Sequence, residues 1–260
     1  MSHSHSSDLV KDLFVNVFVA LGCADSTAAV SADESASGEL VAAWSFDATG
    51  NDIAKDTSRH GHEGMLRGAV PAAGKTGGGI ECHQDALVEV PHTAVFDDFK
   101  RGICVAAWVN RSADTAWNTV MSREVKDGAS EYFGLAVVKN KALFSVDPDG
   151  AHYQNIKSDE DVPASEWVHL AGTYDNAMLR LYVNGRLVKS APCTIPFQFA
   201  DHNPLLIGGN SNSQGKSWVD CFHGRLDDVR LYNLAISDVE VLKMVAQHPN
   251  PSPKRPHSNK

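Results

Sequence analysis

Long apolar runs and basic clusters are both missing from this sequence of 260 residues. A helix that crosses a bilayer needs about 20 consecutive apolar residues, and the apolar run near the start, residues 13–21, is far shorter. Lys254 and Arg255 form only a short basic pair in a proline-rich tail. The formal net charge of −9 and the isoelectric point of about 5.7 give a surface that repels phosphate backbones. The sequence therefore argues against a transmembrane span and against a nucleic-acid partner.

Cysteine is scarce and lacks metal-binding spacing. The five cysteines form no Cys-x-x-Cys pair, which argues against a cysteine zinc site. If Cys23 belongs to a leader, the others form an even set that suits an oxidising compartment. Our hypothesis is a disulfide between Cys193 and Cys221. The alternative is buried free thiols, which Cys104 fits better because its segment is apolar.

The first residues resemble an export signal. Residues 13–21 are apolar and are followed by small residues, as in a signal peptide. The segment 20–23 resembles a loose bacterial lipobox, which would attach a lipid to Cys23. The alternatives are a start codon placed too early and an amphipathic N-terminal helix. We expect an extracellular or cell-envelope location.

Composition divides the chain into three parts. Residues 1–37 combine the leader with a polar, acidic and disordered linker, and residues 248–260 form a disordered tail rich in proline. Residues 38–247 lie between them without a further shift in composition. The hydrophobic content of 43% can bury one sizeable core, and 20 glycines and 11 prolines suit a fold with many turns.

The central block is typical of an all-β fold. Many short apolar or alternating segments recur without helical patterns between them, as in a sandwich or barrel. They cover residues 40–46, 87–90, 103–109, 119–122, 132–138, 142–146, 167–174, 179–183, 187–188, 205–207 and 226–232. Residues 158–166 contain Pro163, which disfavours a central strand, so we expect a solvated loop there.

Two local patterns define a turn and a helix. Asn184 and Gly185 stand between alternating apolar residues and predict a hairpin with a type I′ turn, because both tolerate positive φ. Ser237 and Glu240 form a capping box that opens a short helix through about Val245.

Three motifs carry a resemblance to a known family. They are residues 44–47 with the loop 56–64, residues 166–175 with 181–185, and residues 224–237. In order and spacing they resemble the laminin-G-like jelly-roll family of the concanavalin A-like lectin/glucanase superfamily, over roughly residues 38–246. The resemblance implies an antiparallel jelly-roll sandwich of two sheets. This fold carries lectins, adhesion modules, lyases and glycosidases, so function has to be argued from a site.

The resemblance also implies a structural calcium ion at the edge of the sandwich. The positions that match the family's ligands are Asp56 and Asp227. Backbone carbonyls of His60 and Gly61 and the carboxylate of Asp47 are further candidates, because calcium takes six to eight oxygen ligands.

The residues support the calcium hypothesis and also leave an alternative. Strand alternation places Asp227 on the same face as Val229 and Leu231, which look like core, so its carboxylate needs a partner. That partner could instead be an arginine such as Arg225 or Arg59. Asp56 would then only cap its turn through Ser58.

Catalytic motifs of the fold are missing. Jelly-roll glucanases carry Glu-x-Asp-x-x-Glu along one strand, and the nearest segment, residues 158–166, is interrupted by Pro163. The alternating Arg/Glu and Gln-x-His motifs of jelly-roll alginate lyases and the Gly-x-Ser-x-Gly elbow are also absent. His169 lies in a predicted strand, where we expect a structural role. We name no catalytic residue, and the sequence argues against an enzyme.

Aromatic and amide side chains provide a candidate ligand site. Sugar-binding surfaces offer aromatic faces to sugar rings and amides or acids to hydroxyl groups. The candidates are Trp117, Asn118, Tyr153, Gln154, Asn210, Asn212 and Trp218. For each of them, the alternative is an ordinary, partly buried side chain.

The sequence thus favours a non-catalytic, secreted or envelope-attached binding module of lectin type. It would recognise carbohydrate and hold a structural calcium ion. The alternatives are a protein-binding adhesion module and a polysaccharide-degrading glycosidase or lyase. An exposed aromatic pair along a groove would indicate sugar, whereas a flat apolar patch on the order of several hundred Å² would indicate protein.

Overall fold

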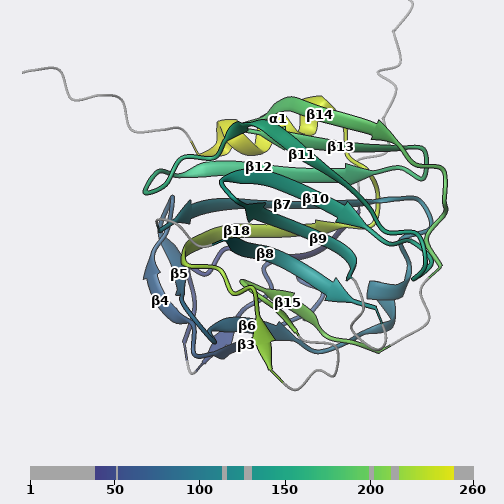
Figure 1. Ribbon diagram of the computed structural model, residues 1–260. Helices are drawn as coiled ribbons and strands as arrows, with labels where there is room; N and C mark the ends of the chain where they lie inside the picture. Colours follow the sequence, from purple (N-terminus) through teal and green to yellow (C-terminus); the bar gives the residue numbers. More distant parts are fainter. Residues whose placement is uncertain are drawn as a thin grey trace, which may run out of the picture. The chain divides into compact units, whose positions relative to one another are not determined.

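The alternating apolar and polar side chains fold into two stacked antiparallel sheets (Figure 1). The computed structural model describes residues 39–50, 52–112, 116–125, 131–198, 202–211 and 217–248. All of them belong to one compact unit, Ala36–Lys260. The predicted leader and linker, and all but the first residue of the predicted tail, lie outside the described residues.

The first sheet has the strand order β14-β13-β12-β7-β18-β5-β4, and β1 also pairs with β18. Its strands are β1 (Leu40–Trp44), β4 (Val70–Ala73), β5 (Gly78–Cys82), β7 (Ile103–Arg111), β12 (Val168–Tyr174), β13 (Met178–Val183), β14 (Arg186–Pro192) and β18 (Gly224–Tyr232).

The second sheet has the order β11-β10-β9-β8-β15-β6-β3-β2. Its strands are β2 (Ile53–Ala54), β3 (Gly64–Arg67), β6 (Leu87–Val90), β8 (Trp117–Glu124), β9 (Glu131–Val138), β10 (Lys141–Val146), β11 (Gln154–Asp161) and β15 (Leu205–Ile207). The described residues also form a small hairpin of β16 (Asn210–Ser211) and β17 (Trp218–Val219), a 3₁₀ turn η1 (Ala94–Asp97) and the helix α1 (Asp238–Gln247). This architecture confirms the predicted two-sheet jelly-roll.

The core fills the space between the two sheets. Val105 and Leu170 of the first sheet and Leu135 and Phe144 of the second are fully buried in one hydrophobic cluster. The ring of Phe144 lies over Gly172 of β12, where an added Cβ would stand only 2.2 Å from the ring. Burial of these aliphatic and aromatic side chains is the main stabilising contribution to the sandwich.

A β-bulge in β18 changes the predicted face of one acidic residue. Asp228 adopts φ of 45°, and the register between β18 and β7 shifts between Asp227 and Arg230. The extra residue lets Leu226, Val229 and Leu231 all enter the core. Asp227 therefore does not share the core face of Val229 and Leu231, and the prediction from strict alternation was wrong.

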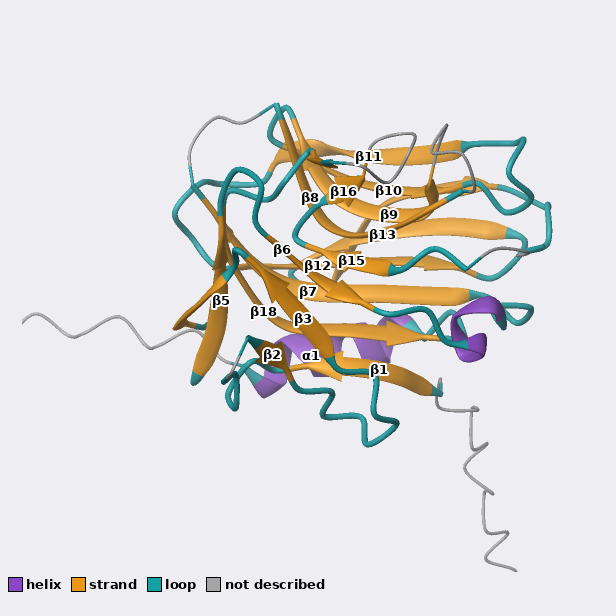
Figure 2. Cartoon of the chain, turned by 90° about the horizontal axis from the view of Figure 1, so that it is seen from below, coloured by secondary structure: helices purple, strands orange, loops and turns teal. Residues whose placement is uncertain are grey.

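The two local predictions are confirmed. Asn184 and Gly185 have φ of 49° and 77°, as the turn between β13 and β14 requires. The hydroxyl of Ser237 accepts from the backbone N–H of Glu240, whose side chain accepts from the Ser237 backbone N–H. The helix α1 lies on the outer side of the first sheet (Figure 2), where Val241 packs into a second apolar cluster.

Residues 154–161 form a strand where a solvated loop had been predicted from residue 158. β11 is an edge strand that pairs only with β10. Exposed acidic side chains fit such an edge, and Asp161 and Glu160 pair there with Lys141 and Arg186. The strand ends before Pro163, so proline sets the boundary and leaves the strand intact.

The described cysteines are all buried and free. Cys193 contacts the hydroxyl of Tyr174, whereas the sulfur of Cys221 lies beside Gly209. The predicted Cys193–Cys221 disulfide is therefore not formed, and the alternative of buried thiols describes this structure. No helix in the described residues is both long and apolar enough to span a membrane.

Candidate functional site

The outer face of the second sheet carries a polar cavity. On β8, Val120 and Met121 both pack into the core, because a bulge shifts the register between Thr119 and Met121. The cavity lies on the opposite face and has a volume of about 110 Å³. It is lined by Trp117, Thr119, Ser122, Glu131, Gly134, Ala136, Tyr153, Asn210 and Asp220.

Small residues of β9 form the floor of this cavity. Gly134 and Ala136 face outward between the core residues Phe133, Leu135 and Val137. A Cβ on Gly134 would stand 2.9 Å from Oγ of Ser145 and 3.0 Å from Oε1 of Glu131. The absence of a side chain at Gly134 therefore leaves room for the Glu131 carboxyl group.

Glu131 is the polar centre of the cavity. Its carboxylate accepts hydrogen bonds from the Ser145 hydroxyl at 2.8 Å, the Tyr153 hydroxyl at 3.4 Å and the Asn210 amide at 3.5 Å. Burial raises the pKa of Glu131, and these hydrogen bonds oppose the rise only in part. The group is thus a hydrogen-bonding carboxyl held in a fixed orientation.

Two further carboxyl groups lie near Glu131. Burial raises the pKa of Glu124 to about 7, despite hydrogen bonds from Ser211. Burial also raises the pKa of Asp220. Sequence reasoning missed all three acids. Glu124 and Glu131 stand just beyond the facing ends of the predicted apolar segments 119–122 and 132–138, and that placement was the available signal.

The β16–β17 hairpin lies over the outer face of β8. The Ser122 hydroxyl contacts the carbonyl of Gly209 and the side-chain oxygen of Asn210, both at 3.0 Å. Beside the hairpin is an open groove of about 370 Å³. It is lined by Gln84, Asp85, Ala116, Trp117, Trp218, Val219, Asp220, Cys221 and His223. The groove and the cavity share Trp117 and Asp220, so they form one continuous surface.

The structure brings together four of the predicted ligand residues. Trp117, Tyr153 and Asn210 line the cavity, and Trp218 lines the groove with Trp117. Trp117 and Tyr153 remain 40% and 38% exposed, so their rings are available to a ligand.

Two predicted ligand residues lie elsewhere, and one was not placed. Asn118 is fully buried, and its side-chain oxygen accepts from the backbone N–H of His223. It alternates with Trp117 along β8, so the two side chains face opposite sides of the sheet. Gln154 is exposed at the start of β11 and is not among the lining residues. Asn212 lies outside the described residues.

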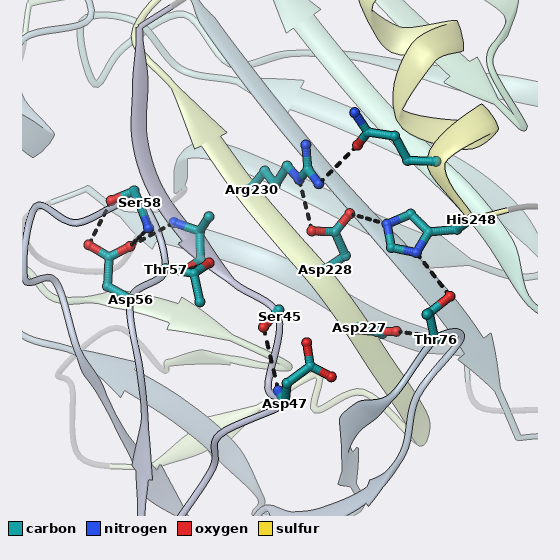
Figure 3. Close-up of polar contacts among 12 residues, drawn as sticks. Ser45, Asp47, Asp56, Thr57, Ser58, Thr76, Asp227, Asp228, Arg230 and His248 are labelled. Atoms are coloured by element: carbon teal, nitrogen blue, oxygen red, sulfur yellow. Dashed lines mark hydrogen bonds and ion pairs between the residues drawn. The ribbon is translucent and has the colours of Figure 1, made fainter.

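The carboxylate of Asp56, a predicted calcium ligand, already accepts hydrogen bonds from neighbouring protein groups (Figure 3). Its Oδ1 accepts from the backbone N–H groups of Ala43 and Ser58, and its Oδ2 accepts from the Ser58 hydroxyl and the N–H of His62. Four donors point at one carboxylate, which leaves no lone pair for a cation. Asp56 caps its turn through Ser58, as the alternative interpretation held.

The carboxylates of Asp227 and Asp47, two further predicted calcium ligands, also accept hydrogen bonds from the backbone. Asp227 accepts from the backbone N–H of Thr76, and Asp47 accepts from that of Gly78. Nδ1 of His60 lies 3.1 Å from the Val41 carbonyl. Gly61 adopts φ of 79° in the same loop as Asp56. Asp56 thus has no acceptor position left for calcium, whereas calcium binding by Asp47 and Asp227 stays a prediction.

A series of linked ion pairs and hydrogen bonds lies beside Asp227 (Figure 3). Asp228 pairs with Arg230 at 2.8 Å and with Nε2 of His248 at 3.1 Å, and Nδ1 of His248 contacts Oγ1 of Thr76 at 3.0 Å. These contacts connect the C-terminal end of α1 to the turn between β4 and β5. Arg225, which the sequence offered as a partner of Asp227, donates to the carbonyl of Ala73.

Two stacked antiparallel sheets with a cavity on one outer face define a jelly-roll sandwich. A sequence model of the concanavalin A-like lectin/glucanases superfamily matches residues 83–242, and the chain belongs to this superfamily. No curated protein matches the chain at a significant level.

Solved structures of distant relatives share the fold. The binding domain of Paraclostridial Mosquitocidal Protein 1 has a TM-score of 0.65 at 13% identity, over 81% of this chain and 52% of that one. Domain 4 of AbnA, a GH43 extracellular arabinanase from Geobacillus stearothermophilus in complex with arabinotriose, has a TM-score of 0.64 at 19% identity, over 80% and 99%.

A third solved structure comes from work on botulinum neurotoxin type C, whose cell entry depends on interaction with two ganglioside molecules. It has a TM-score of 0.56 at 10% identity, over 82% of this chain and 52% of that one. The chain thus spans about half the length of the two toxin chains and nearly all of the arabinanase domain. At these identities the likeness establishes the fold alone.

Proposed function

We propose that this chain is a carbohydrate-binding module whose sugar site is the joined cavity and groove on the outer face of β8 and β9. The observation that carries the proposal is the pairing of exposed aromatic rings with fixed polar groups. Trp117, Tyr153 and Trp218 border the surface, while Asn210 and Glu131 lie within it. Aromatic faces pack against the C–H groups of a sugar ring, and the amide and carboxyl groups bind its hydroxyls.

The shape of the site supports sugar over a protein partner. A protein interface would offer a broad, flat apolar patch, whereas this surface is hollow and its lining alternates rings with carboxyl and amide groups. Glu131 is oriented by three neighbours before any ligand arrives, which lowers the entropic cost of binding. The arabinotriose complex of the related arabinanase domain and the gangliosides of the neurotoxin agree with a sugar ligand.

A glycan and polysaccharide screen tests the proposal. We expect binding by the wild-type chain and loss of at least about tenfold in affinity on Trp117→Ala, because a stacked ring contributes about 1–3 kcal/mol to such contacts. Leu187→Ala is the matched control, since Leu187 is 42% exposed on β14 of the other sheet. Equal losses in both variants, or no binding to any glycan, would contradict the proposal.

The same screen separates binding from turnover. A binding module leaves the polysaccharide intact, so product analysis should show no new reducing ends and no unsaturated products. Either product would instead support the glycosidase or lyase alternative, with the carboxyl groups of Glu124 and Glu131 as the first to substitute.

We further propose that the module works outside the cell or at its envelope. Support comes from the apolar segment 13–21 and the small residues that follow it. Mass spectrometry of the mature N-terminus tests this proposal. A cleaved chain that begins at Cys23 with a lipid mass supports the anchored form, and an intact Met1 contradicts export through this leader.

A further inference from the structure

Three potential metal ligands converge at the end of the second sheet, apart from the sugar site. His92 follows β6, Asp97 ends η1, and His202 precedes β15. One ligand atom from each side chain lies within 4.8 Å of the other two. Among the described residues, this is the one such group of three or more His, Cys, Asp or Glu side chains.

The geometry of the group suits a metal ion. Nε2 of His92 lies 2.9 Å from Oδ2 of Asp97, and the rings of His92 and His202 have centroids 4.7 Å apart with planes at 59°. Zinc binds imidazole nitrogen and carboxylate oxygen at about 2.0–2.2 Å, so its ligand atoms stand about 3–4 Å from one another. Small side-chain movements would therefore complete the coordination.

We propose that His92, Asp97 and His202 bind a divalent transition-metal ion of the zinc type. Two imidazoles and one carboxylate are ligands that such ions accept, whereas calcium prefers an all-oxygen set. Three protein ligands leave one coordination position open for water. The site differs in residues and in ion class from the calcium site that the family resemblance implied.

Hydrogen bonds from neighbouring groups orient the carboxylate of Asp97. Oδ1 of Asp97 accepts from Nη2 of Arg123 at 2.6 Å, and the same guanidinium donates to the carbonyl of Phe96. The Arg123 side chain is fully buried, so it fixes Oδ2 toward His92. Hydrogen-bonded carboxylate ligands of this kind are a regular feature of metal sites.

The third ligand is also positioned by the fold. Nδ2 of Asn203 donates to the carbonyl of Glu124 at 3.2 Å, which joins the segment that carries His202 to the end of β8. A bound ion would thus connect three segments: the chain after β6, the turn η1 and the chain before β15. Such a cross-link stabilises the folded state by an amount that rises with the logarithm of the free ion concentration once that concentration exceeds the dissociation constant.

Metal titration of the full chain, prepared without an affinity tag and stripped with a chelator, tests the site. We expect binding of one Co²⁺ or Zn²⁺ at this site, with Co²⁺ giving the visible absorption of a low-symmetry site and Zn²⁺ raising the melting temperature.

Substitutions separate this site from the other histidines. His202→Ala should lower affinity by more than about tenfold. Because the His202 side chain is exposed, the variant should fold normally, which circular dichroism of the metal-free variant checks. His152→Ala is the matched control, because His152 and Asp149 form a similar pair at 2.8 Å without a second imidazole. The remaining histidines among the 12 are shared by all variants.

Two results would overturn the proposal. One is an unchanged stoichiometry and affinity in His202→Ala, and the other is equal losses in His202→Ala and His152→Ala. Either would show that His92 and Asp97 form only a hydrogen-bonded pair. The outcome does not depend on sugar binding, so failure of this site and failure of the sugar site can be told apart.

Discussion

The side chain of Glu131 occupies the space that the missing side chain of Gly134 leaves on β9. A methyl group on Gly134 would lie 3.0 Å from Oε1 of Glu131, so the carboxyl group occupies space that only glycine leaves open. Glycine in a strand interior weakens the strand and marks a close approach. Glycine at position 134 thus weakens β9 locally but leaves room for Glu131, the polar centre of the proposed sugar site.

Gly134→Ala should therefore weaken sugar binding with little effect on stability. The new methyl group pushes the Glu131 carboxyl away from Ser145, and we expect a loss of about 1–2 kcal/mol in binding free energy, roughly 5–30-fold in affinity. Stability should change by less than about 1 kcal/mol, because a small shift of the Ser145 and Glu131 side-chain ends admits the methyl group and alanine restricts the unfolded chain.

Calorimetric titration with the best glycan from the screen measures this effect. Gly50→Ala is the control, since no atom lies within 4 Å of a Cβ built there. Unchanged affinity in Gly134→Ala, beside an active wild-type chain, would place the sugar outside the cavity.

The pKa of Glu124 predicts a stability that falls as pH rises. Burial raises this pKa from 4.5 to about 7, so the folded chain keeps a proton that the unfolded chain releases. The folded state is then most favoured below about pH 4.5 and loses this contribution up to about pH 7, by at most about 3 kcal/mol.

Glu124→Gln should flatten that dependence, because glutamine does not titrate. Urea unfolding at about pH 5, 6, 7 and 8 gives the free energy of unfolding for both chains. Glu166→Gln serves as the control on an exposed side chain. Parallel pH profiles in wild type and Glu124→Gln would show that another group causes any dependence seen.

Local sequence patterns were enough to predict those parts of the structure that depend only on residues close together in the chain. The Asn184-Gly185 turn and the Ser237 cap follow from backbone freedom and short-range hydrogen bonds, so they could be predicted. The bulge at Asp228 could not, because the fit of β18 against β7 sets it. Its single extra residue reversed the predicted face of Asp227.

The candidate site shows the same division. Exposed aromatics such as Trp117 could be selected by type, and alternation along β8 could also have removed Asn118. The proposed roles of Glu131 and His202 depend on residues that are distant in sequence and that the fold brings close to them. Asn210 approaches Glu131 across 79 positions, and no local pattern reports such an approach.

The contacts of Asp56 predict that calcium leaves stability unchanged. All four acceptor positions of its carboxylate are used by donors of the surrounding loop and of β1. The melting temperature should be the same in calcium and in a calcium-selective chelator. Asp56→Asn should still lose about 1–3 kcal/mol, because an amide N–H₂ would face backbone donors.

Thermal scans with excess calcium, with the chelator and with Asp52→Asn as the loop control check this prediction. Asp52 is exposed in the neighbouring turn and has a φ of 60°, which asparagine tolerates. A calcium-dependent rise in melting temperature that disappears in Asp56→Asn would restore the calcium hypothesis.

Close contact between the sheets at Gly172 and Phe144 predicts a coupled pair of core substitutions. Gly172→Ala places a methyl group 2.2 Å from the ring of Phe144, and overpacking of this kind costs about 1–3 kcal/mol. Phe144→Leu removes ring atoms and should recover part of that loss, so the double variant should be more stable than the sum predicts, by about 0.5–3 kcal/mol. Urea unfolding of the two single variants and the double variant measures the coupling. Additive losses would mean that the sheets separate locally and that Gly172 does not set their spacing.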